Sequence, residues 1–378
     1  MYGATLSAAA AERLGYHPYP APTAANSIPY DGRPACNNCG FCAFFACPIH
    51  AKGDPVAMLQ RALLTGRAEL RSECFVSRIR TNGGRATGVD YIGPDGTERQ
   101  LDASHVVLAA GAVETPRLLL LSGFDHDLIG RYLMVHFQTI ATGAFPDLDF
   151  HSERGRAVTH IHDDPIVGDE ASRTAAREAG LAWIRGGIVE HGGPYLPVLE
   201  ATLYPWGQKH SAMMRQSMLR RRLWAFTMQG EDLPLATNRI DLDPKIRDAR
   251  GFPVARMTYR PHRHELVASW HHGPRLAAVL DEMGASWSSV VTTPGSKGGP
   301  GEGRLSDVPQ SRHVMGTVRM GDDPARSVVD AFGRFHAFPN LVVADSSVFV
   351  TATGYGPTLT LVALAARAAA AMAGAGPN

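Results

Sequence analysis

The chain lacks an excess of either charge, a long apolar run and internal repeats. Its 37 basic residues balance 36 acidic ones, which gives no electrostatic basis for binding nucleic acid or an anionic membrane. The longest apolar stretch, 359–372, contains Arg367 and is too short for a membrane span, so it predicts a buried helix. Because the first residues lack the charged region and apolar core of a secretory signal, we expect a cytoplasmic protein.

Cysteine is also scarce, and most of it falls within one short block. Cys36, Cys39, Cys42 and Cys47 follow the pattern C-x2-C-x2-C-x4-C-P, whereas Cys74 stands alone. Such clustering is unlike a disulfide framework, which spreads its bridges over a small secreted domain. The spacing is similar to that of iron–sulfur cluster-binding runs, although the last gap is one residue longer. An iron–sulfur cluster, a structural zinc ion and plain reduced thiols all remain open for this block.

The pattern along the chain predicts an α/β fold with an α+β insertion. At 378 residues the chain can form one large domain or two interleaved ones. Residues 1–69 predict a helix, an extended segment and the cysteine block, and 70–136 predict strands followed by a helix. Alternating apolar and polar residues in 137–310 predict an antiparallel sheet, and 311–378 return to the α/β pattern. Within these segments we expect helices at 6–14, 56–64, 117–121 and 261–283, and strands at 73–80, 88–92, 105–111, 239–243 and 254–259.

Two apolar strands end on small or acidic residues and lead towards helices. The first covers 105–111, ends in Ala-Ala-Gly and continues to Thr115 and Pro116, which predict a helix start. The second ends at Asp345 and is followed by a Gly-Pro-Thr corner at 356–358 that opens an Ala/Leu-rich helix. A strand, a small-residue turn and a helix in this order bring the backbone close to a phosphate or a flavin in α/β folds.

Together with a histidine before a Gly-Thr turn at 313–317, these segments closely resemble the C-terminal two-thirds of the glucose–methanol–choline (GMC) family of flavin oxidoreductases. The resemblance implies an FAD cofactor, and an incomplete Rossmann-like FAD-binding domain interleaved with an antiparallel-sheet substrate domain. It places Val76 at the adenine, Asp345 near the ribityl–pyrophosphate part and Pro357-Thr358 at the pyrimidine edge of the flavin. The residues that it assigns to cofactor binding are Val76, Ala110, Gly111, Thr115, Asp345, Ser346, Gly356, Pro357 and Thr358.

The resemblance also implies that His313 is the catalytic base. Oxidation of an alcohol by hydride transfer requires the hydroxyl proton to leave, and a histidine near neutral pKa suits that role. The family keeps a second active-site histidine or asparagine at a fixed distance after the first, and here that position is Gly356. We therefore expect Tyr355, Thr353 or a side chain of the middle segment to substitute, unless the reaction is altered or lost.

A dinucleotide-binding glycine motif is missing. The Gly-rich stretch 298–303 follows no apolar strand and contains a proline, so it does not qualify as G-x-G-x-x-G. We expect the FAD-binding domain to be incomplete, with an exposed sheet edge, and an N-terminal FAD-binding fragment is a candidate partner.

These observations favour an FAD-dependent oxidoreductase that acts on the CH–OH group of an alcohol, sugar or polyol. The cysteine block favours an external electron acceptor over oxygen. Three alternatives remain open: a catalytically degenerate GMC-like subunit, an iron–sulfur electron-transfer partner built on the four clustered cysteines, and a non-redox relative that cleaves carbon–carbon bonds.

Overall fold

The computed structural model describes residues 2–40, 42, 47–151, 155–156, 158–192, 201, 205–217, 221–291 and 311–374. The chain folds into two compact units, and each unit is assembled from separate stretches of sequence. Unit 1 comprises residues 1–70, 138–230 and 266–303. Unit 2 comprises residues 71–137, 231–265 and 304–378. The strands expected at 239–243 and 254–259 therefore belong to the same unit as the C-terminal segment.

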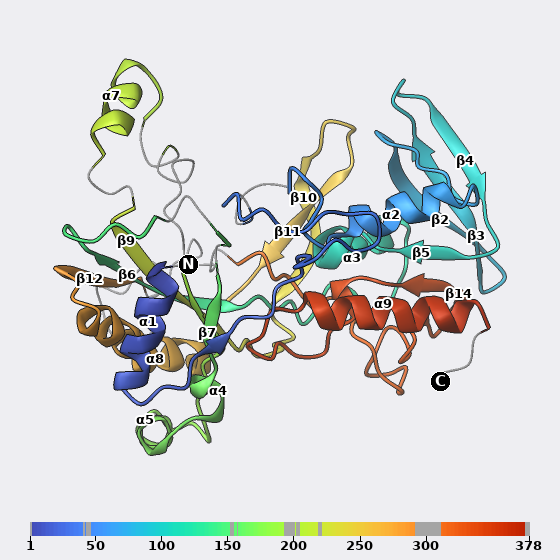
Figure 1. Ribbon diagram of the computed structural model, residues 1–378. Coiled ribbons are helices and arrows are strands. Elements are labelled where there is room, and N and C mark those ends of the chain that lie inside the picture. The colour runs from blue at the N-terminus through green and yellow to red at the C-terminus, as the bar shows by residue number, and fades with distance from the viewer. Residues whose placement is uncertain are drawn as a thin grey trace. The chain divides into compact units, whose positions relative to one another are not determined.

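Unit 1 is built around an antiparallel sheet. Within the described residues its strand order is β1-β7-β8-β9-β6-β12, and the pairs β1–β7, β7–β8, β8–β9 and β6–β12 are antiparallel (Figure 1). The elements that lie wholly or mainly in this unit are α1 (Tyr2–Arg13), β1 (Tyr19–Pro20), α2 (Pro55–Leu64), β6 (Phe137–Ala144), β7 (His160–His162), α4 (Asp164–Val167), α5 (Glu170–Glu178), β8 (Val189–His191), α7 (Gln208–Gln216), β9 (Leu223–Gly230), α8 (Arg263–Glu282) and β12 (Trp287–Val291).

Helix α1 packs on this sheet through small side chains. Ala4, Ser7, Ala8 and Ala11 are buried, and their spacing places them on one face of a helix. Ala4 and Ala11 belong to the same apolar cluster as the fully buried Trp224 of β9, and residues of α8 complete that cluster. Small residues let the helix approach a sheet that carries large aromatic side chains.

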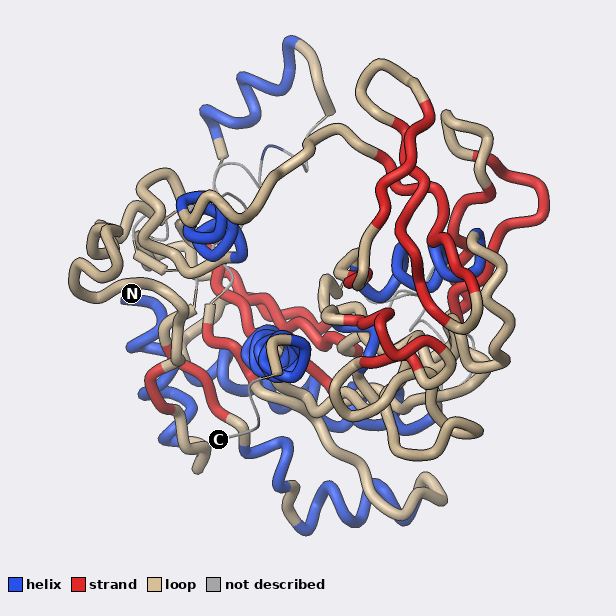
Figure 2. The backbone as a smooth tube through the Cα atoms, turned by 90° about the vertical axis from the view of Figure 1, so that its right-hand side faces the viewer, coloured by secondary structure: helices blue, strands red, loops and turns tan. Residues whose placement is uncertain are grey.

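The described residues of unit 2 form three small sheets. Strands β2, β3 and β4 form an antiparallel meander, β10 and β11 form a hairpin, and β13, β14 and β5 form a mixed sheet (Figures 1 and 2). The elements are β2 (Phe75–Asn82), β3 (Arg85–Ile92), β4 (Glu98–Asp102), β5 (Val106–Leu108), α3 (Gly111–Leu121), β10 (Arg239–Arg247), β11 (Pro253–Thr258), β13 (Arg334–Phe335), β14 (Phe338–Val343), the 3-10 helix η1 (Ser346–Val348) and α9 (Thr358–Met372).

The parallel pair β5–β14 lies at the core of unit 2. Leu341 pairs with Val106 and Val343 with Leu108, and all four side chains are buried. The buried side chain of Asn340 donates hydrogen bonds to the carbonyls of Ala86 and Ser104 and accepts one from the Ala86 N–H. Because a buried amide must be paired, Asn340 fixes the start of β14 against its neighbours. Strands β5 and β14 consequently have their carboxyl ends side by side at one edge of the sheet.

Helix α3 begins earlier than the sequence predicted. It starts at Gly111, so Pro116 lies inside the helix rather than at its first turn. A proline has no N–H, which leaves the carbonyl of Ala112, four residues earlier, without its helical partner. The hydroxyl of Thr317 donates to that carbonyl at 2.9 Å. A tertiary contact thus compensates for the proline.

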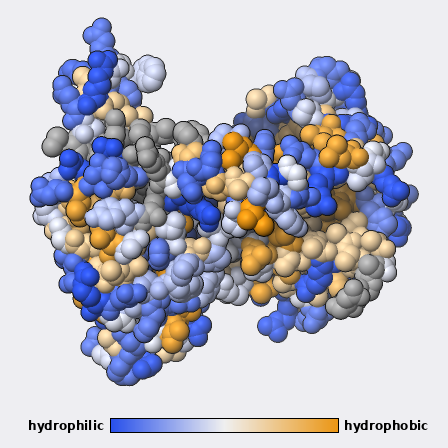
Figure 3. All heavy atoms as spheres, viewed as in Figure 1, coloured by the Kyte–Doolittle hydropathy of each residue, from blue (hydrophilic) through white to orange (hydrophobic). Residues whose placement is uncertain are grey.

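The expectation of a buried C-terminal helix is wrong. In α9 only Ala368 is buried, whereas Leu359 is 82% and Val362 58% exposed. Figure 3 shows apolar residues along the surface of this helix. The helix contacts the unit 2 core through Leu361 and Leu364, which are partly buried. Among the described helices, none combines the length and the apolar character needed to cross a membrane.

Candidate functional site

The carboxyl ends of β5 and β14 are tied together by Asp345. One of its carboxylate oxygens, Oδ2, accepts hydrogen bonds from the Gly111 N–H at 2.9 Å and the Thr115 hydroxyl at 2.5 Å. The other, Oδ1, accepts from the N–H and the hydroxyl of Ser347 at 2.8 and 2.5 Å. Asp345 is only 6% exposed. Both carboxylate oxygens therefore accept hydrogen bonds from this chain. Any contribution of Asp345 to cofactor binding would be indirect, through the positions in which it holds Gly111, Thr115 and Ser347.

The segment that carries His313 joins the same edge. The Gly316 N–H donates to the Ser346 carbonyl at 3.0 Å, and the Thr317 hydroxyl binds the Ala112 carbonyl at the start of α3. Three stretches that are far apart in the sequence, near 111, 316 and 346, are thus held together by hydrogen bonds. The carboxyl edge of a parallel sheet is where α/β folds bind their ligands.

Glycine is required where the backbones in this region approach one another. Gly316 has φ of +79°, and an added Cβ would lie 2.1 Å from the carbonyl oxygen of Tyr132. Gly130 has φ of +82°, and its added Cβ would lie 2.0 Å from the carbonyl oxygen of Ile240. Residues 130–134 therefore pass between β10 on one side and the His313 segment on the other. The backbones are so close at Gly130 and Gly316 that neither position can carry a side chain.

His313 is partly buried and lies against a second histidine. Its Nδ1 is 2.9 Å from Nδ1 of His136, and the two rings meet edge to face at 85°. Burial, followed by the positive charge of Arg312, lowers the pKa of His313 below its usual value. Because a lowered pKa keeps the imidazole neutral near pH 7, His313 has the protonation state that a general base needs. Sequence reasoning missed His136, which no motif marks.

Two buried carboxyl groups lie next to this pair in unit 2. Asp232 Oδ2 accepts from the Val135 N–H at 2.6 Å, and its Oδ1 accepts from the Tyr259 hydroxyl at 2.7 Å. Burial, then the neighbouring Glu265, raises the pKa of Asp232 well above its usual value. Burial raises the pKa of Glu265 to about 7. The sequence pattern gave no signal for these groups, because isolated acidic residues are usually solvent-exposed.

The start of α9 presents backbone amides, whereas at the start of α3 the N–H groups of Ala110 and Gly111 already donate to Thr115 and Asp345. Neither Ala110 nor Pro357, which precede these helices, makes a side-chain capping hydrogen bond within the described residues. The first N–H groups of a helix favour negative charge. An added Cβ on Gly356 would meet no described heavy atom within 4 Å, so the space before α9 is open. Tyr355 is 40% exposed there.

The remaining residues assigned to the cofactor are less closely grouped. Thr358 is the first residue of α9 and is exposed, and Val76 of β2 is 37% exposed. The backbone of Val76 pairs with Tyr91 of β3. The described contacts bring neither residue to Asp345.

The cysteine block provides no metal site in the part of the chain that is described. Cys36, Cys39, Cys42 and Cys47 are free and partly exposed, and no three potential ligands in the described residues lie close enough to hold a metal ion. Burial alone raises the pKa of the Cys47 thiol, but hydrogen bonds from the backbone amides of 49–52 outweigh it and lower the pKa overall. An iron–sulfur cluster is therefore not supported.

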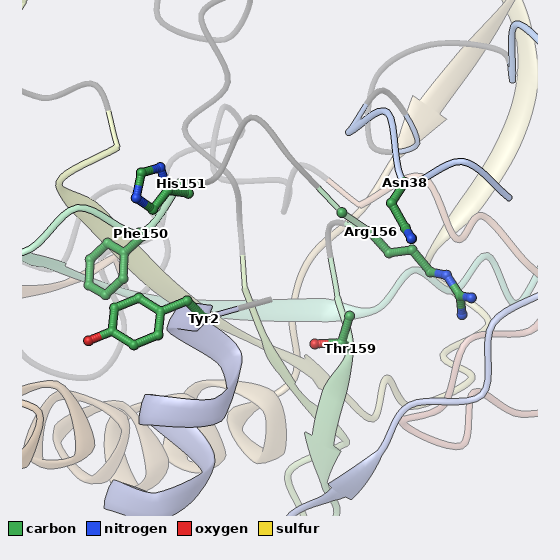
Figure 4. A pocket seen from close by; sticks show the side chains of 7 residues that line it. Tyr2, Asn38, Phe150, His151, Arg156 and Thr159 are labelled. Carbon is green, nitrogen blue, oxygen red and sulfur yellow. The ribbon is translucent and has the colours of Figure 1, made fainter.

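A surface cavity of about 460 Å³ lies in unit 1, and one of its lining residues, Asn38, stands between Cys36 and Cys39 of the cysteine block. In Figure 4 the rings of Tyr2, Phe150 and His151 lie near one another, with Arg156 and Asn38 further along. The lining residues are Tyr2, Asn38, Phe150, His151, Gly155, Arg156 and Thr159. Nothing in this lining resembles a reacting centre.

A solved structure defines the class of the fold. Pyridoxine 4-oxidase from Mesorbium loti is 17% identical to this chain and superposes with a TM-score of 0.51, covering 80% of this chain and 57% of that chain. The arrangement of helices, antiparallel sheets and the β5–β14 pair is accordingly that of an α/β FAD-binding fold combined with a substrate domain.

Sequence models of the GMC oxidoreductase family match residues 5–138 and 234–365, which together exceed half of the chain. The chain belongs to the GMC oxidoreductase family. Because the amino-terminal family model matches from residue 5, the expectation that only the C-terminal two-thirds of the family is represented is not supported.

Two curated relatives match nearly all of this chain. A 2-methyl-1,2-propanediol dehydrogenase from Mycolicibacterium austroafricanum is 29% identical over 94% of this chain and 63% of its own length. A gluconate 2-dehydrogenase flavoprotein from Pantoea cypripedii is 28% identical over 96% of this chain and 61% of its own length. The chain thus spans less than two-thirds of the length of these relatives.

Proposed function

We propose that this chain contributes the flavin-facing and substrate-facing parts of an FAD-dependent oxidoreductase that acts on CH–OH donors. The observation that carries the proposal is the junction at the carboxyl edge of β5 and β14. There the start of α3, Asp345 and the His313 segment are held together by hydrogen bonds. The relatives named above act on a diol and on gluconate, which supports a small polyhydroxylated substrate.

In this proposal His313 removes the hydroxyl proton of the substrate. When bound, FAD would accept the hydride from the carbinol carbon. The partly buried imidazole is kept neutral by its lowered pKa, so its free nitrogen can accept a proton at neutral pH. Tyr355, 40% exposed before α9, is the side chain nearest in sequence to the open position at Gly356, and we assign it to substrate contact.

The residues present fit the flavin side of the cofactor. The start of α9 at Thr358 has no capping side chain and offers its amides to a negative edge of the flavin. Pro357 has no N–H, and the N–H groups of Ala110 and Gly111 are donated to Thr115 and Asp345, so these three residues would shape the surface under the flavin rather than donate to it. Ser346 lies in the same junction, and Val76 is assigned to the adenine. The sequence supplies no glycine-rich turn for the pyrophosphate. These residues would therefore orient the flavin ring system. The pyrophosphate of FAD would have to be bound by residues outside this set.

We further propose that an additional strand completes the FAD-binding sheet at β5. Among the described strands β5 pairs only with β14, and Val107 on it is 47% exposed. An unpaired edge next to a cofactor site invites pairing with another segment. The proposed partner is an FAD-binding fragment with a G-x-G-x-x-G motif. It would supply both a strand that pairs with the free edge of β5 and the glycine motif that this sequence lacks.

The domain roles follow from the same reasoning. We assign residues 70–136 and 311–378 to FAD binding with the catalytic histidine, 137–310 to the substrate, and 1–69 to a supporting N-terminal segment. Within 137–310, the stretch 231–265 folds in unit 2 together with the FAD-binding segments. An external electron acceptor, rather than oxygen, is proposed from the names of the two dehydrogenase relatives described above, while other matching relatives are named oxidases.

The test is a dye-linked assay with a panel of diols, sugars and sugar acids, run on the chain loaded with FAD. His313→Gln should lower kcat by about 100- to 10,000-fold, the usual contribution of a general base. The matched control is His105→Gln, because His105 is an exposed histidine at the other end of β5. Turnover that survives in His313→Gln, or is equally low in both variants, refutes the assignment of the base. FAD binding is followed separately by flavin fluorescence.

A further inference from the structure

Two histidine rings from distant parts of the sequence meet in unit 2. Nδ1 of His136 and Nδ1 of His313 are 2.9 Å apart, and the ring centroids are 4.9 Å apart. His136 has no exposed surface, whereas His313 is partly exposed. The buried ring therefore lies behind the ring that can reach a substrate.

The meeting of the rings is set by backbone register. Met134 and Met315 exchange two N–H···O hydrogen bonds of 2.9 Å in an antiparallel bridge. In an antiparallel pairing, the residue two positions after one partner lies opposite the residue two positions before the other partner. Side chains two residues apart on a strand point to the same face. The bridge thus places His136 opposite His313, on the same face.

The backbone next to His136 is fixed by a buried carboxyl group. The Val135 N–H donates to Asp232 at 2.6 Å, and Asp232, which is 2% exposed, also accepts from the Tyr259 hydroxyl. Two residues earlier, the Leu133 N–H donates to the Asn238 carbonyl at 3.0 Å. Hydrogen bonds on both sides hold the segment, so the position of the His136 ring is determined before any ligand binds.

A 2.9 Å contact between two imidazole nitrogens requires one proton between them. If His136 donated it, a neutral His313 would carry its own proton on Nε2 and could not accept another there. If His313 donates it, Nε2 of His313 keeps a lone pair. Since Nδ1 of His313 is occupied by His136, Nε2 is the nitrogen left to face a substrate.

We propose that His136 is a positioning residue: its Nδ1 accepts the Nδ1–H of His313 and holds His313 in the tautomer whose Nε2 can accept the substrate proton. This inference rests on the proposed function of His313 as the base. On reaction, His313 gains one proton at Nε2 and retains the other on Nδ1, where the His136 lone pair stabilises the imidazolium. No proton passes to His136, and no further reactant is required.

The first test reads the tautomer directly, without turnover. Two-bond ¹H–¹⁵N correlation spectra of the full chain labelled with ¹⁵N-histidine separate the two neutral tautomers, and His313→Gln assigns the His313 signals. We expect Nδ1–H at His313 in the wild type and in His136→Asn, whose side-chain oxygen can accept the same bond. His136→Leu should lose this preference. A wild-type His313 protonated on Nε2, or an unchanged tautomer in His136→Leu, overturns the proposal.

The second test is kinetic and separates the two proposals. In the FAD-loaded chain His136→Leu should lower kcat by about 10- to 150-fold, the range for a hydrogen bond to a charged group, with little change in KM. His136→Asn should recover most of that loss, which a merely structural role would not predict. If His313→Gln abolishes turnover while His136→Leu leaves kcat unchanged, only the positioning role fails. If His313→Gln leaves turnover unchanged, the proposed base fails, whatever the spectra show.

A matched control comes from a second buried histidine pair. In unit 1, Nδ1 of His162 is 2.7 Å from Nε2 of His191, and neither residue is exposed. His162→Leu removes a comparable buried pair, so it reports the general cost of such a change to folding. It should leave the His313 tautomer and kcat unchanged. An equal effect of His162→Leu and His136→Leu would refute a specific role for His136.

Discussion

Replacing Glu265 by glutamine should stabilise the chain at neutral and alkaline pH. Glu265 is 2% exposed, and its Oε2 has no hydrogen-bond partner among the described residues. Burial therefore raises its pKa from 4.5 to about 7. The folded chain then holds a proton that the unfolded chain releases, so the unfolding free energy falls as pH rises from 4.5 to 7. A shift of this size corresponds to a fall of about 3 kcal/mol.

Glutamine keeps an oxygen that can accept the 2.8 Å hydrogen bond from the Leu233 N–H, but it does not ionise. Glu265→Gln should thus match the wild type near pH 4.5 and exceed it by up to about 3 kcal/mol at pH 8. Urea unfolding between pH 4.5 and 8 measures the difference, with the exposed Glu178→Gln as the matched control. Parallel pH profiles for wild type and Glu265→Gln would refute the reasoning.

Three further substitutions test the junction. Asp345→Ala leaves buried donors without their acceptor and should cost about 3 to 4 kcal/mol in urea unfolding; a cost near zero would mean that the carboxylate does not tie the strands. Gly316→Ala should cost at least about 2 kcal/mol in the same assay, since its φ is positive and the new Cβ would meet the Tyr132 carbonyl; an unchanged midpoint would contradict the close approach. Gly356→Asn fits the open space and should change stability by less than about 0.5 kcal/mol while raising kcat in the dye-linked assay; lost stability would show that the space is not open.

The sequence predicted the parts of unit 2 that depend on local pattern. Apolar strands ending at Gly111 and at Asp345 were recognisable because buried parallel strands read as continuous apolar runs. The structure brings these two ends within hydrogen-bond distance, a contact that the sequence pattern did not predict. The exposed helix α9 was not predictable in the same way. An Ala/Leu-rich segment has the same composition whether a neighbouring element covers it or leaves it in solvent.

The histidine pair shows why the rest of the site could not be predicted. His136 is separated from His313 by 177 residues, and its place follows from the bridge between Met134 and Met315. Backbone pairing of this kind cannot be inferred from residue composition or from the hydrophobic periodicity of the sequence. The same holds for Asp232, whose burial depends on a hydrogen bond to the Val135 backbone. Long-range register, rather than residue type, decides which polar groups meet.

The passage of residues 130–136 between β10 and the His313 segment has a consequence for how this region can evolve. Its backbone is hydrogen-bonded on both sides, at Gly130 and Leu133 among others. Substitutions of Arg131 and Tyr132, the partly exposed residues here, leave that pairing intact, but a one-residue insertion or deletion reverses which side each later residue faces. Such a change would turn His136 away from His313. Sequence length between Gly130 and His136 should therefore be under stricter selection than the identity of Arg131 or Tyr132.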